Sequence, residues 1–242
     1  ILIENNSKQP ETFRAYERMQ KEHPDNLKVV TWEGKGFNYS ALNNFGEQYA
    51  TGEYLLLLNN DTEVMTPDFI EEMMGYLRRP DAGVVGAKLY FADHLVQHAG
   101  IVVGVRGALA HANQDFSAKR EGYLARAVRP GNFSAVTGAC QMVRRDVFEQ
   151  VEGYDEEFAV GFNDADFCLR VWEAGYRTIF TPYAELYHYE FTSRGREEAS
   201  EEKLRRWKRE QALFMQRWPG FFLMGDPWLG PNLSSESEYF SL

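Results

Sequence analysis

Apolar runs and predicted helices alternate along the first part of the chain. Residues 1–3 are a short apolar run closed by polar residues, a pattern that predicts a buried strand, and residues 28–31 are a second predicted strand. The segments 11–22, which is broken before Pro24, and 37–49 are predicted helices. Strands that alternate with helices are joined by right-handed crossovers in a parallel sheet, so we expect an α/β fold.

The clearest pattern is the run of residues 54–58, which is apolar at every position. Apolar residues on both faces are typical of a central strand in a parallel sheet. The polar cluster at residues 59–63 follows directly, and Thr66 and Pro67 then form a helix start with a stripe that continues to Leu77. Ligands of such sheets bind beyond the carboxyl ends of the strands, so we expect this cluster to face a binding site.

The rest of the chain continues the α/β pattern. Residues 84–105 are rich in β-forming residues, and residues 108–131 are polar and irregular, which predicts a long loop or lid. Further predicted elements are strands at 136–143, 177–180 and 186–188, helices at 145–151 and 164–173, an amphipathic helix that Ser200 caps, and an extended tail over 226–242.

Composition narrows the class of protein. The chain has 242 residues, 44% of them hydrophobic, which is enough for one substantial core. Its formal net charge of -10 argues against a nucleic-acid binder, which normally carries a basic face. Cys140 and Cys168 are in no metal-ligand spacing, so we expect buried free thiols in a reducing cytoplasm. No apolar run approaches the roughly 20 residues of a membrane-spanning helix.

Asp61 is the first candidate for chemistry. A carboxylate just past a hydrophobic strand, flanked by amides, suits a hard divalent cation that also binds phosphate oxygens. Asn60 can supply a neutral oxygen or bind a ribose hydroxyl. The alternative is an Asx turn that only closes the end of the strand.

Asp164 and Asp166 open a predicted helix. Asp164 lies three residues before Phe167 and four before Cys168, which start the apolar stripe, so we expect it on the inward face, where an ionised carboxylate can act as a general base. Asp166 lies four residues before Arg170 and can pair with it on the flank. The alternative, favoured for Asp166, is a first-turn carboxylate that serves only the helix dipole.

Five further residues are weaker candidates. His188 is a potential metal ligand, although a lone histidine among aromatic residues is more often structural. Arg194 can bind a diphosphate, and Lys35, in a Gly-Lys-Gly turn, can reach a phosphate. Glu4 and Asn5 end the first predicted strand and can contact a nucleotide base.

His98, His111 and Asn113 frame the predicted loop at 108–131. Their spacing matches no motif, and we expect no more than the ordinary polarity of a surface loop at each of them.

Several motifs occur in a fixed order: an acidic-Asn-x-Ser turn at 4–7, Asn-x-Gly at 44–46, Gly-Glu-Tyr at 52–54 before the Asp61 strand, Thr-Gly-Ala-Cys at 137–140, Gly-Tyr-Asp-Glu at 153–156, the Asp164 helix at 163–170 and a His-to-Arg-Gly segment at 188–195. This ordered set resembles the pattern of family 2 glycosyltransferases with the GT-A fold. The tail at 226–234 is similar to bacterial members that build surface polysaccharides, often called rhamnosyltransferase-like.

The resemblance implies a GT-A fold, with a mixed, mainly parallel central sheet flanked by helices. The catalytic domain would span residues 1–195, with residues 196–242 packed on it. Asp61 and His188 would bind Mg²⁺ or Mn²⁺, and Asp164 would be the catalytic base. Contacts to the donor would come from Glu4, Asn5, Lys35, Asn44, Asn60 and Arg194.

The resemblance also implies an activity. The chain would be an inverting enzyme that moves a sugar from a UDP-, dTDP- or GDP-linked donor to a glycan or lipid-linked acceptor in surface-polysaccharide synthesis. It would act in the cytoplasm, with peripheral association at the inner membrane.

This sequence departs from the family pattern in several places. Asn59 and Asn60 stand where acidic residues are usual, and Asn163 replaces a glutamate. The family also has a strand and a helix before the position of Ile1, so we expect that the sequence is truncated there and binds the donor weakly. Two alternatives stay open: a sugar nucleotidyltransferase, which needs a Gly-rich basic phosphate loop, and a non-catalytic carbohydrate-binding or scaffold module with a decayed site.

Overall fold

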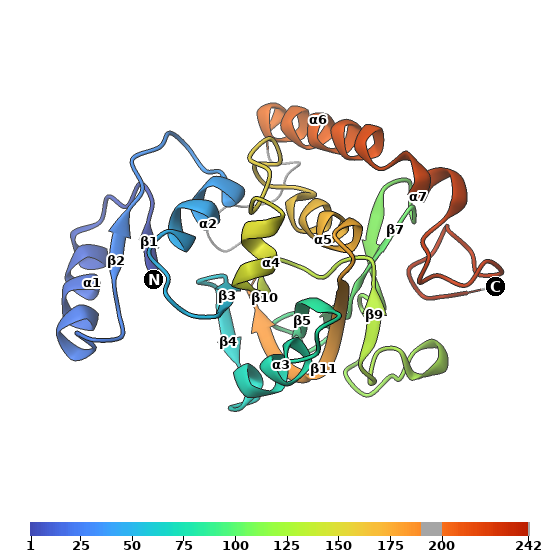
Figure 1. Cartoon of the computed structure of the whole chain (residues 1–242), viewed down its shortest axis with the longest axis horizontal. Helices are drawn as coiled ribbons and strands as arrows, with labels where there is room; N and C mark the ends of the chain where they lie inside the picture. The colour runs from blue at the N-terminus through green and yellow to red at the C-terminus, as the bar shows by residue number, and fades with distance from the viewer. Residues whose placement is uncertain (190–199, 242) are drawn as a thin grey trace.

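A mixed sheet of seven strands forms the centre of the computed structural model, which describes residues 1–189 and 200–241 (Figure 1). Its path is β3 (Tyr54–Leu58), β10 (Cys140–Arg144), β5 (Ala82–Tyr90), β11 (Arg177–His188) and β4 (Thr62–Val64), with β6 (Val96–His98) beside β5 and β9 (Gly131–Phe133) beside β11. Two small sheets pair β1 (Leu2–Glu4) with β2 (Val29–Thr31) and β7 (Ile101–Val103) with β8 (Leu109–His111). The helices are α1 (Pro10–Glu22), α2 (Tyr39–Glu47), α3 (Phe69–Leu77), α4 (Arg145–Gln150), α5 (Asn163–Glu173), α6 (Glu201–Arg217), α7 (Pro219–Met224) and the 3₁₀ helix η1 (Tyr123–Ala125).

Strand pairing confirms the predicted α/β fold with a mixed sheet. β5 runs parallel to β11 and β1 to β2, whereas β10 is antiparallel to both β3 and β5. The expectation that residues 54–58 form a central parallel strand is wrong. In the described chain β3 pairs with β10 alone, in antiparallel register, and Leu58 is 44% exposed. An apolar run indicates burial but does not specify the direction of the neighbouring strand.

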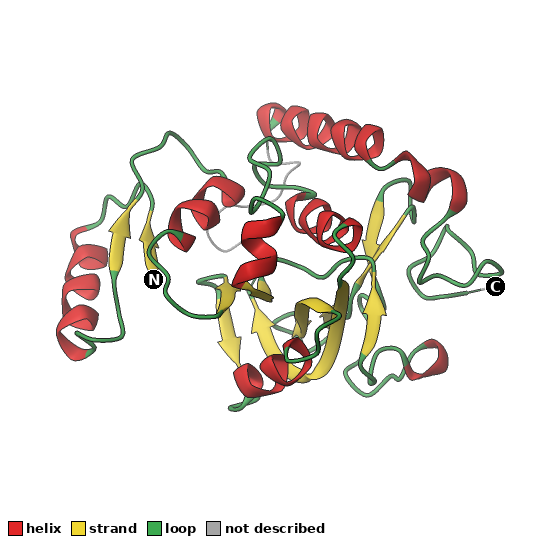
Figure 2. Ribbon diagram, in the orientation of Figure 1, coloured by secondary structure: helices red, strands yellow, loops and turns green. Residues whose placement is uncertain are grey.

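Helices cover both faces of the central sheet, as Figure 2 shows. Side chains of β5 alternate between two cores, because successive residues of a strand point to opposite faces. Val85, Ala87 and Leu89 belong to the core under α3. Val84 and Tyr90 belong to the larger core, which also contains buried residues of α4, α5 and the C-terminal helices.

Gly86 faces the larger core, where a Cβ atom would come within 2.3 Å of the Val136 side chain. Since overpacking a core typically costs about 1–3 kcal/mol, Gly86→Ala should lower the free energy of unfolding by about 2 kcal/mol. Gly75→Ala is the matched control: an added Cβ there meets nothing, and removing a helical glycine should stabilise by about 0.5–1 kcal/mol. Urea unfolding of both variants tests this, and equal midpoints would show that Gly86 is not tightly packed against Val136.

Several predicted boundaries differ from the structure, including the start of β10 at Cys140 in place of residue 136. Residues 177–188 form one strand, β11, with register shifts along β5, and not two separate strands. Helix α3 begins at Phe69 and not at Pro67. The reason is that Thr66 Oγ1 accepts a hydrogen bond from the backbone N–H of Glu185 at 3.2 Å and so does not cap the helix.

The predicted loop at 108–131 is more ordered than an open lid. It contains β8 and η1, and Phe116 is buried and stacks on Tyr239 of the C-terminal tail with ring centroids 5.1 Å apart. The tail itself is anchored by Asp226, whose buried Oδ2 accepts the Val103 N–H at 2.8 Å. Loop and tail therefore pack on each other beside β7.

Candidate active site

The pairing of β4 with β11 brings two predicted metal ligands together. Thr62 lies opposite His188 in this antiparallel pair, and the Tyr189 N–H donates to the Asp61 carbonyl oxygen at 2.8 Å. This register places Asp61 Oδ1 3.2 Å from His188 Nε2. The polar cluster at residues 59–63 therefore leads into a strand, β4, that the sequence pattern does not predict.

Gln97 on β6 orients the His188 ring. His188 Nδ1 lies 2.8 Å from Gln97 Oε1, and Gln97 Nε2 donates to the His188 carbonyl oxygen at 3.3 Å. An amide oxygen only accepts, so Nδ1 carries a proton and Nε2 is the nitrogen that faces Asp61 Oδ1. That carboxylate oxygen is buried and accepts no hydrogen bond from the other described residues. With both nitrogens protonated, His188 forms an ion pair with Asp61, whereas neutral His188 and Asp61 are two acceptors that one divalent cation can bind, so the pair fits a metal.

The side-chain amides beside Asp61 are poorer candidates for metal ligands. Asn59 Nδ2 lies 3.3 Å from His188 Nε2, so Asn59 directs a donor and not an oxygen toward the pair. Asn60 is exposed. Within residues 1–189 and 200–241, no three His, Cys, Asp or Glu side chains converge on one point. The pair thus offers one carboxylate and one imidazole, and a hard cation would need further oxygen ligands, such as those of a diphosphate.

Asp164 lies in the first turn of α5, and a loop before β10 links it to the Asp61 end of the site. The Gly138 N–H donates to Asp164 Oδ2 at 3.0 Å, while the Asn59 N–H donates to the Ala139 carbonyl oxygen at 2.9 Å. Asp164 is partly exposed. Two adjacent loop residues therefore contact Asp164 on one side and the strand end that carries Asp61 on the other.

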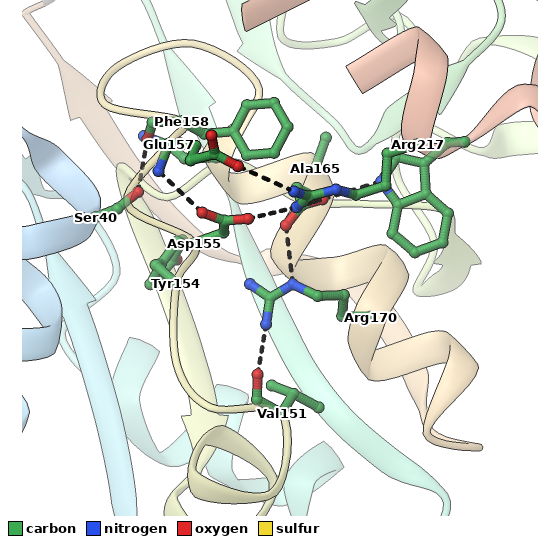
Figure 3. Close-up of polar contacts among 12 residues, drawn as sticks. Ser40, Val151, Tyr154, Asp155, Glu157, Phe158, Ala165, Arg170 and Arg217 are labelled. Carbon is green, nitrogen blue, oxygen red and sulfur yellow. Dashed lines mark hydrogen bonds and ion pairs between the residues drawn. The ribbon is translucent and has the colours of Figure 1, made fainter. Parts of the chain in front are cut away.

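Asp166 has a structural role that goes beyond the helix dipole. Its predicted pairing with Arg170 is confirmed, at 2.8 Å, and its other oxygen accepts hydrogen bonds from Arg217 and the Trp218 indole, both at 3.0 Å. Figure 3 shows the side chains of Arg170, on α5, and Arg217, on α6, pointing toward each other, and both donate to the Asp166 carboxylate. The expected faces are reversed: Asp166 is fully buried and Asp164 is the accessible carboxylate.

The predicted nucleotide contacts near the N-terminus lie in two neighbouring turns. Glu4 is buried, and its Oε1 accepts the backbone N–H three residues further on at 2.7 Å, so this carboxylate closes its own turn. Asn6 Nδ2 donates to the Gly36 carbonyl oxygen at 3.0 Å. That bond brings the turn holding Asn5 beside the turn holding Lys35, whose side chain is exposed.

Asn44 is bonded to a loop of its own protein. Its Nδ2 donates to the Tyr154 carbonyl at 2.8 Å and to Glu156 Oε1 at 3.1 Å, and its Oδ1 accepts the Tyr154 N–H at 2.9 Å. Both amide hydrogens are thus used, and Asn44 joins the motifs at 44–46 and 153–156. The predicted diphosphate ligand Arg194 lies outside the described residues.

Two histidines with no predicted role lie close to this site. His98 is fully buried, which corrects the expectation of surface polarity, and its Nδ1 is 3.0 Å from His111 Nδ1. Burial, with His111 and His188 nearby, lowers the pKa of His98 well below its ordinary value. Burial also lowers the pKa of His111, against the opposing charge of Asp164. Their separation in sequence carries no signal, because only the fold of β6, β7 and β8 brings them together.

The fold is that of solved GT-A glycosyltransferases, and the family match gives the class of the chain. The chain belongs to this group of enzymes, since the family described as "Glycosyltransferase like family 2" matches residues 1–210. Among solved structures, "GalNAc-T7 with UDP, GalNAc and Mn2+" has a similar fold, with a TM-score of 0.68 at 14% identity, over 91% of this chain and 43% of that chain.

Two curated relatives match over nearly the whole chain. The uncharacterized protein y4gI of Sinorhizobium fredii is 40% identical over 100% of this chain, and the O-antigen biosynthesis protein RfbC of Myxococcus xanthus is 38% identical over 97%. The chain spans only 26% and 18% of the lengths of these relatives. The expected resemblance to family 2 glycosyltransferases is therefore confirmed, and one of these similar proteins is named for O-antigen biosynthesis.

Proposed function

We propose that this chain transfers a sugar from a nucleotide-diphosphate donor to a hydroxyl of a glycan or lipid-linked acceptor, with inversion at the anomeric carbon. One observation carries the proposal: Asp61 and His188 contact each other, and the adjacent residues 138 and 139 bond Asp164 on one side and the backbone of Asn59, two residues before Asp61, on the other. The match to a glycosyltransferase family supports sugar transfer as the reaction of these residues.

The Asp61–His188 pair would hold Mg²⁺ or Mn²⁺. The 3.2 Å approach of Asp61 Oδ1 to His188 Nε2 supports this assignment, because both atoms can be metal ligands, as does the presence of Mn²⁺ in the structure of GalNAc-T7. When bound, a divalent ion neutralises charge on the diphosphate leaving group. With a single carboxylate at the pair, the metal should bind weakly until the diphosphate supplies further oxygens.

Asp164 would take the proton of the attacking hydroxyl. The acceptor oxygen forms the new bond to the anomeric carbon, the bond from that carbon to the diphosphate oxygen breaks, and the hydroxyl proton passes to the Asp164 carboxylate. The Gly138 N–H at 3.0 Å fixes the orientation of this carboxylate, and fixed orientation contributes to rate. The donor contacts we carry forward are Asn5, Lys35 and Asn60, together with Arg194.

Surface-polysaccharide synthesis is the proposed setting, because a 38% identical relative is named an O-antigen biosynthesis protein. No helix in the described part of the chain is long and apolar enough to cross a membrane. A donor screen with UDP-, dTDP- and GDP-linked sugars tests the proposal, with release of the nucleoside diphosphate and sugar transfer as readouts. Absence of metal-dependent nucleotide binding across the panel would instead favour a scaffold with a decayed site.

Asp61→Asn should weaken metal-dependent donor binding by about 10- to 100-fold, because it removes the carboxylate of the pair and leaves the side-chain volume unchanged. Calorimetry with Mn²⁺ and each nucleotide diphosphate measures this. Asp68→Asn is the matched control, since Asp68 is an exposed carboxylate before α3 without a side-chain cap bond. Equal Mn²⁺ dependence of donor binding in both variants would show that Asp61 does not bind the metal.

A further inference from the structure

The hydrogen bonds around His98 determine which of its nitrogens carries a proton. Two backbone N–H groups, of Gly100 and Thr137, donate to His98 Nε2 at 3.3 and 3.4 Å. A nitrogen that accepts N–H donors cannot carry a hydrogen in the same direction, so Nε2 is the unprotonated nitrogen. Because a neutral imidazole has one N–H, the proton of His98 lies on Nδ1.

The position of the proton on His98 determines which nitrogen of His111 is protonated. The two Nδ1 atoms are 3.0 Å apart, so one must donate and the other must accept. Since His98 Nδ1 donates, His111 Nδ1 accepts, and the only N–H of the His111 imidazole is on Nε2. A second proton on His111 would place two N–H groups against each other, so the pair holds His111 neutral.

The Nε2–H of His111 is available to a ligand. His111 is partly exposed at the end of β8, and no described residue forms a hydrogen bond with its Nε2. The Thr137 N–H bonds His98 and the adjacent Gly138 N–H bonds Asp164, so the histidine pair and Asp164 are held by neighbouring backbone groups. The charge of Asp164 accordingly opposes the lowering of the His111 pKa. A neutral donor beside a catalytic carboxylate has one clear advantage: a charged imidazolium would attract Asp164 and compete with the substrate for it.

We infer that His111 Nε2–H donates a hydrogen bond to a hydroxyl oxygen of the sugar substrate in front of Asp164, and that His98 is the positioning residue that fixes this donor. The inference rests on the proposed function. An uncharged donor suits a sugar hydroxyl, whereas a phosphate is bound more strongly by cationic side chains. The sugar bound here is that of the donor or that of the acceptor, and the two differ in how they respond to the probes below.

Nitrogen NMR of the imidazole rings tests the proton positions in the protein alone, without any activity. Single-histidine variants assign the signals. At neutral pH we expect a protonated Nε2 and an unprotonated Nδ1 for His111, and the reverse for His98. In His98→Phe, which keeps a ring but removes the N–H donor to His111 Nδ1, His111 should no longer be confined to this single protonation state. A protonated His111 Nδ1 in the unaltered protein would overturn the inference.

Ligand titrations then test the sugar contact. The probes are UDP, dTDP and GDP, the corresponding sugar nucleotides, and the free monosaccharides, each with Mg²⁺. A shift of the His111 Nε2–H signal with a sugar nucleotide but not with its bare nucleotide assigns the donor sugar. A shift with a monosaccharide assigns the acceptor. If no sugar-bearing probe moves the signal more than a bare nucleotide does, His111 does not contact the sugar.

Kinetics separates this inference from the proposed function. His111→Phe keeps a ring but removes the donor, and should lower kcat/KM by about 10-fold, the cost of one lost hydrogen bond to a bound hydroxyl. His111→Gln, which keeps an amide N–H near Nε2, should recover most of this loss, and His23→Gln, at an exposed position, should change nothing. Full activity in His111→Phe refutes the sugar contact but leaves the proposed function intact. An inactive unaltered protein refutes the function, while the NMR results still decide the proton positions.

Discussion

Replacing Asp164 with Asn is expected to lower kcat for sugar transfer by about 10²- to 10⁴-fold, the usual contribution of a general base. The amide cannot accept the proton of the attacking hydroxyl, but its oxygen can still accept the Gly138 N–H that now bonds to Oδ2. The Ala165 N–H, which now bonds to Oδ1 at 2.8 Å, loses its acceptor in this variant, so circular dichroism should confirm that the variant is folded. KM for the donor should change little, because the proton transfer belongs to the transition state and not to ground-state binding.

Asp146→Asn serves as the control for the loss of one carboxylate. Asp146 is exposed at the start of α4 and pairs with Arg144, on an element without contact to Asp164. Steady-state rates at several acceptor concentrations should be unchanged in this variant. A kcat for Asp164→Asn within a factor of about three of the unaltered protein would show that another group takes the proton.

The elements of the fold were predictable from the sequence where a single local pattern decides them. Helix α1, helix α5 and strand β10 all lie within or beside their predicted ranges. The neighbour and direction of β3 were not predictable, since Leu55 and Leu57 are buried in the same way whether the adjacent strand runs parallel or antiparallel. The short strand β4 is polar and exists because it pairs with the end of β11.

The residues of the candidate site were likewise predictable only where a local sequence pattern marks them. Asp61 and Asp164 stand out in the sequence because each sits at the end of a strand or the start of a helix. Two features of the site were not predictable: Gln97 orients His188, and His98 donates a hydrogen bond to His111. Both depend on how β6, β8 and β11 pack in space, which no local spacing encodes. Asn44 is predicted as a ligand contact from the motif resemblance, and the bonds between its amide and the Tyr154 backbone are a further role that no local spacing encodes.

Asp166→Ala is expected to lower the free energy of unfolding by about 3–5 kcal/mol, the range for breaking a buried ion pair by removing one partner. The carboxylate is fully buried and is shared by Arg170, Arg217 and the Trp218 indole. Its removal leaves Arg170, which is 21% exposed, without its carboxylate partner, and leaves Arg217, which is 28% exposed, with Asp155 as its nearest carboxylate. For a chain of this size the melting temperature should fall by roughly 10 °C.

The exposed pair between Arg144 and Asp146 provides the comparison. Asp146→Ala removes a carboxylate that is 61% exposed, and surface pairs contribute about 0–1 kcal/mol, so its unfolding midpoint should stay close to that of the unaltered protein. Because Asp166 joins α6 to α5 two residues after Asp164, partial urea should also reduce transfer activity in Asp166→Ala before global unfolding. If Asp166→Ala and Asp146→Ala unfold at the same urea concentration, Arg217 finds sufficient compensation in Asp155, 2.6 Å away, and the α5–α6 junction does not depend on Asp166.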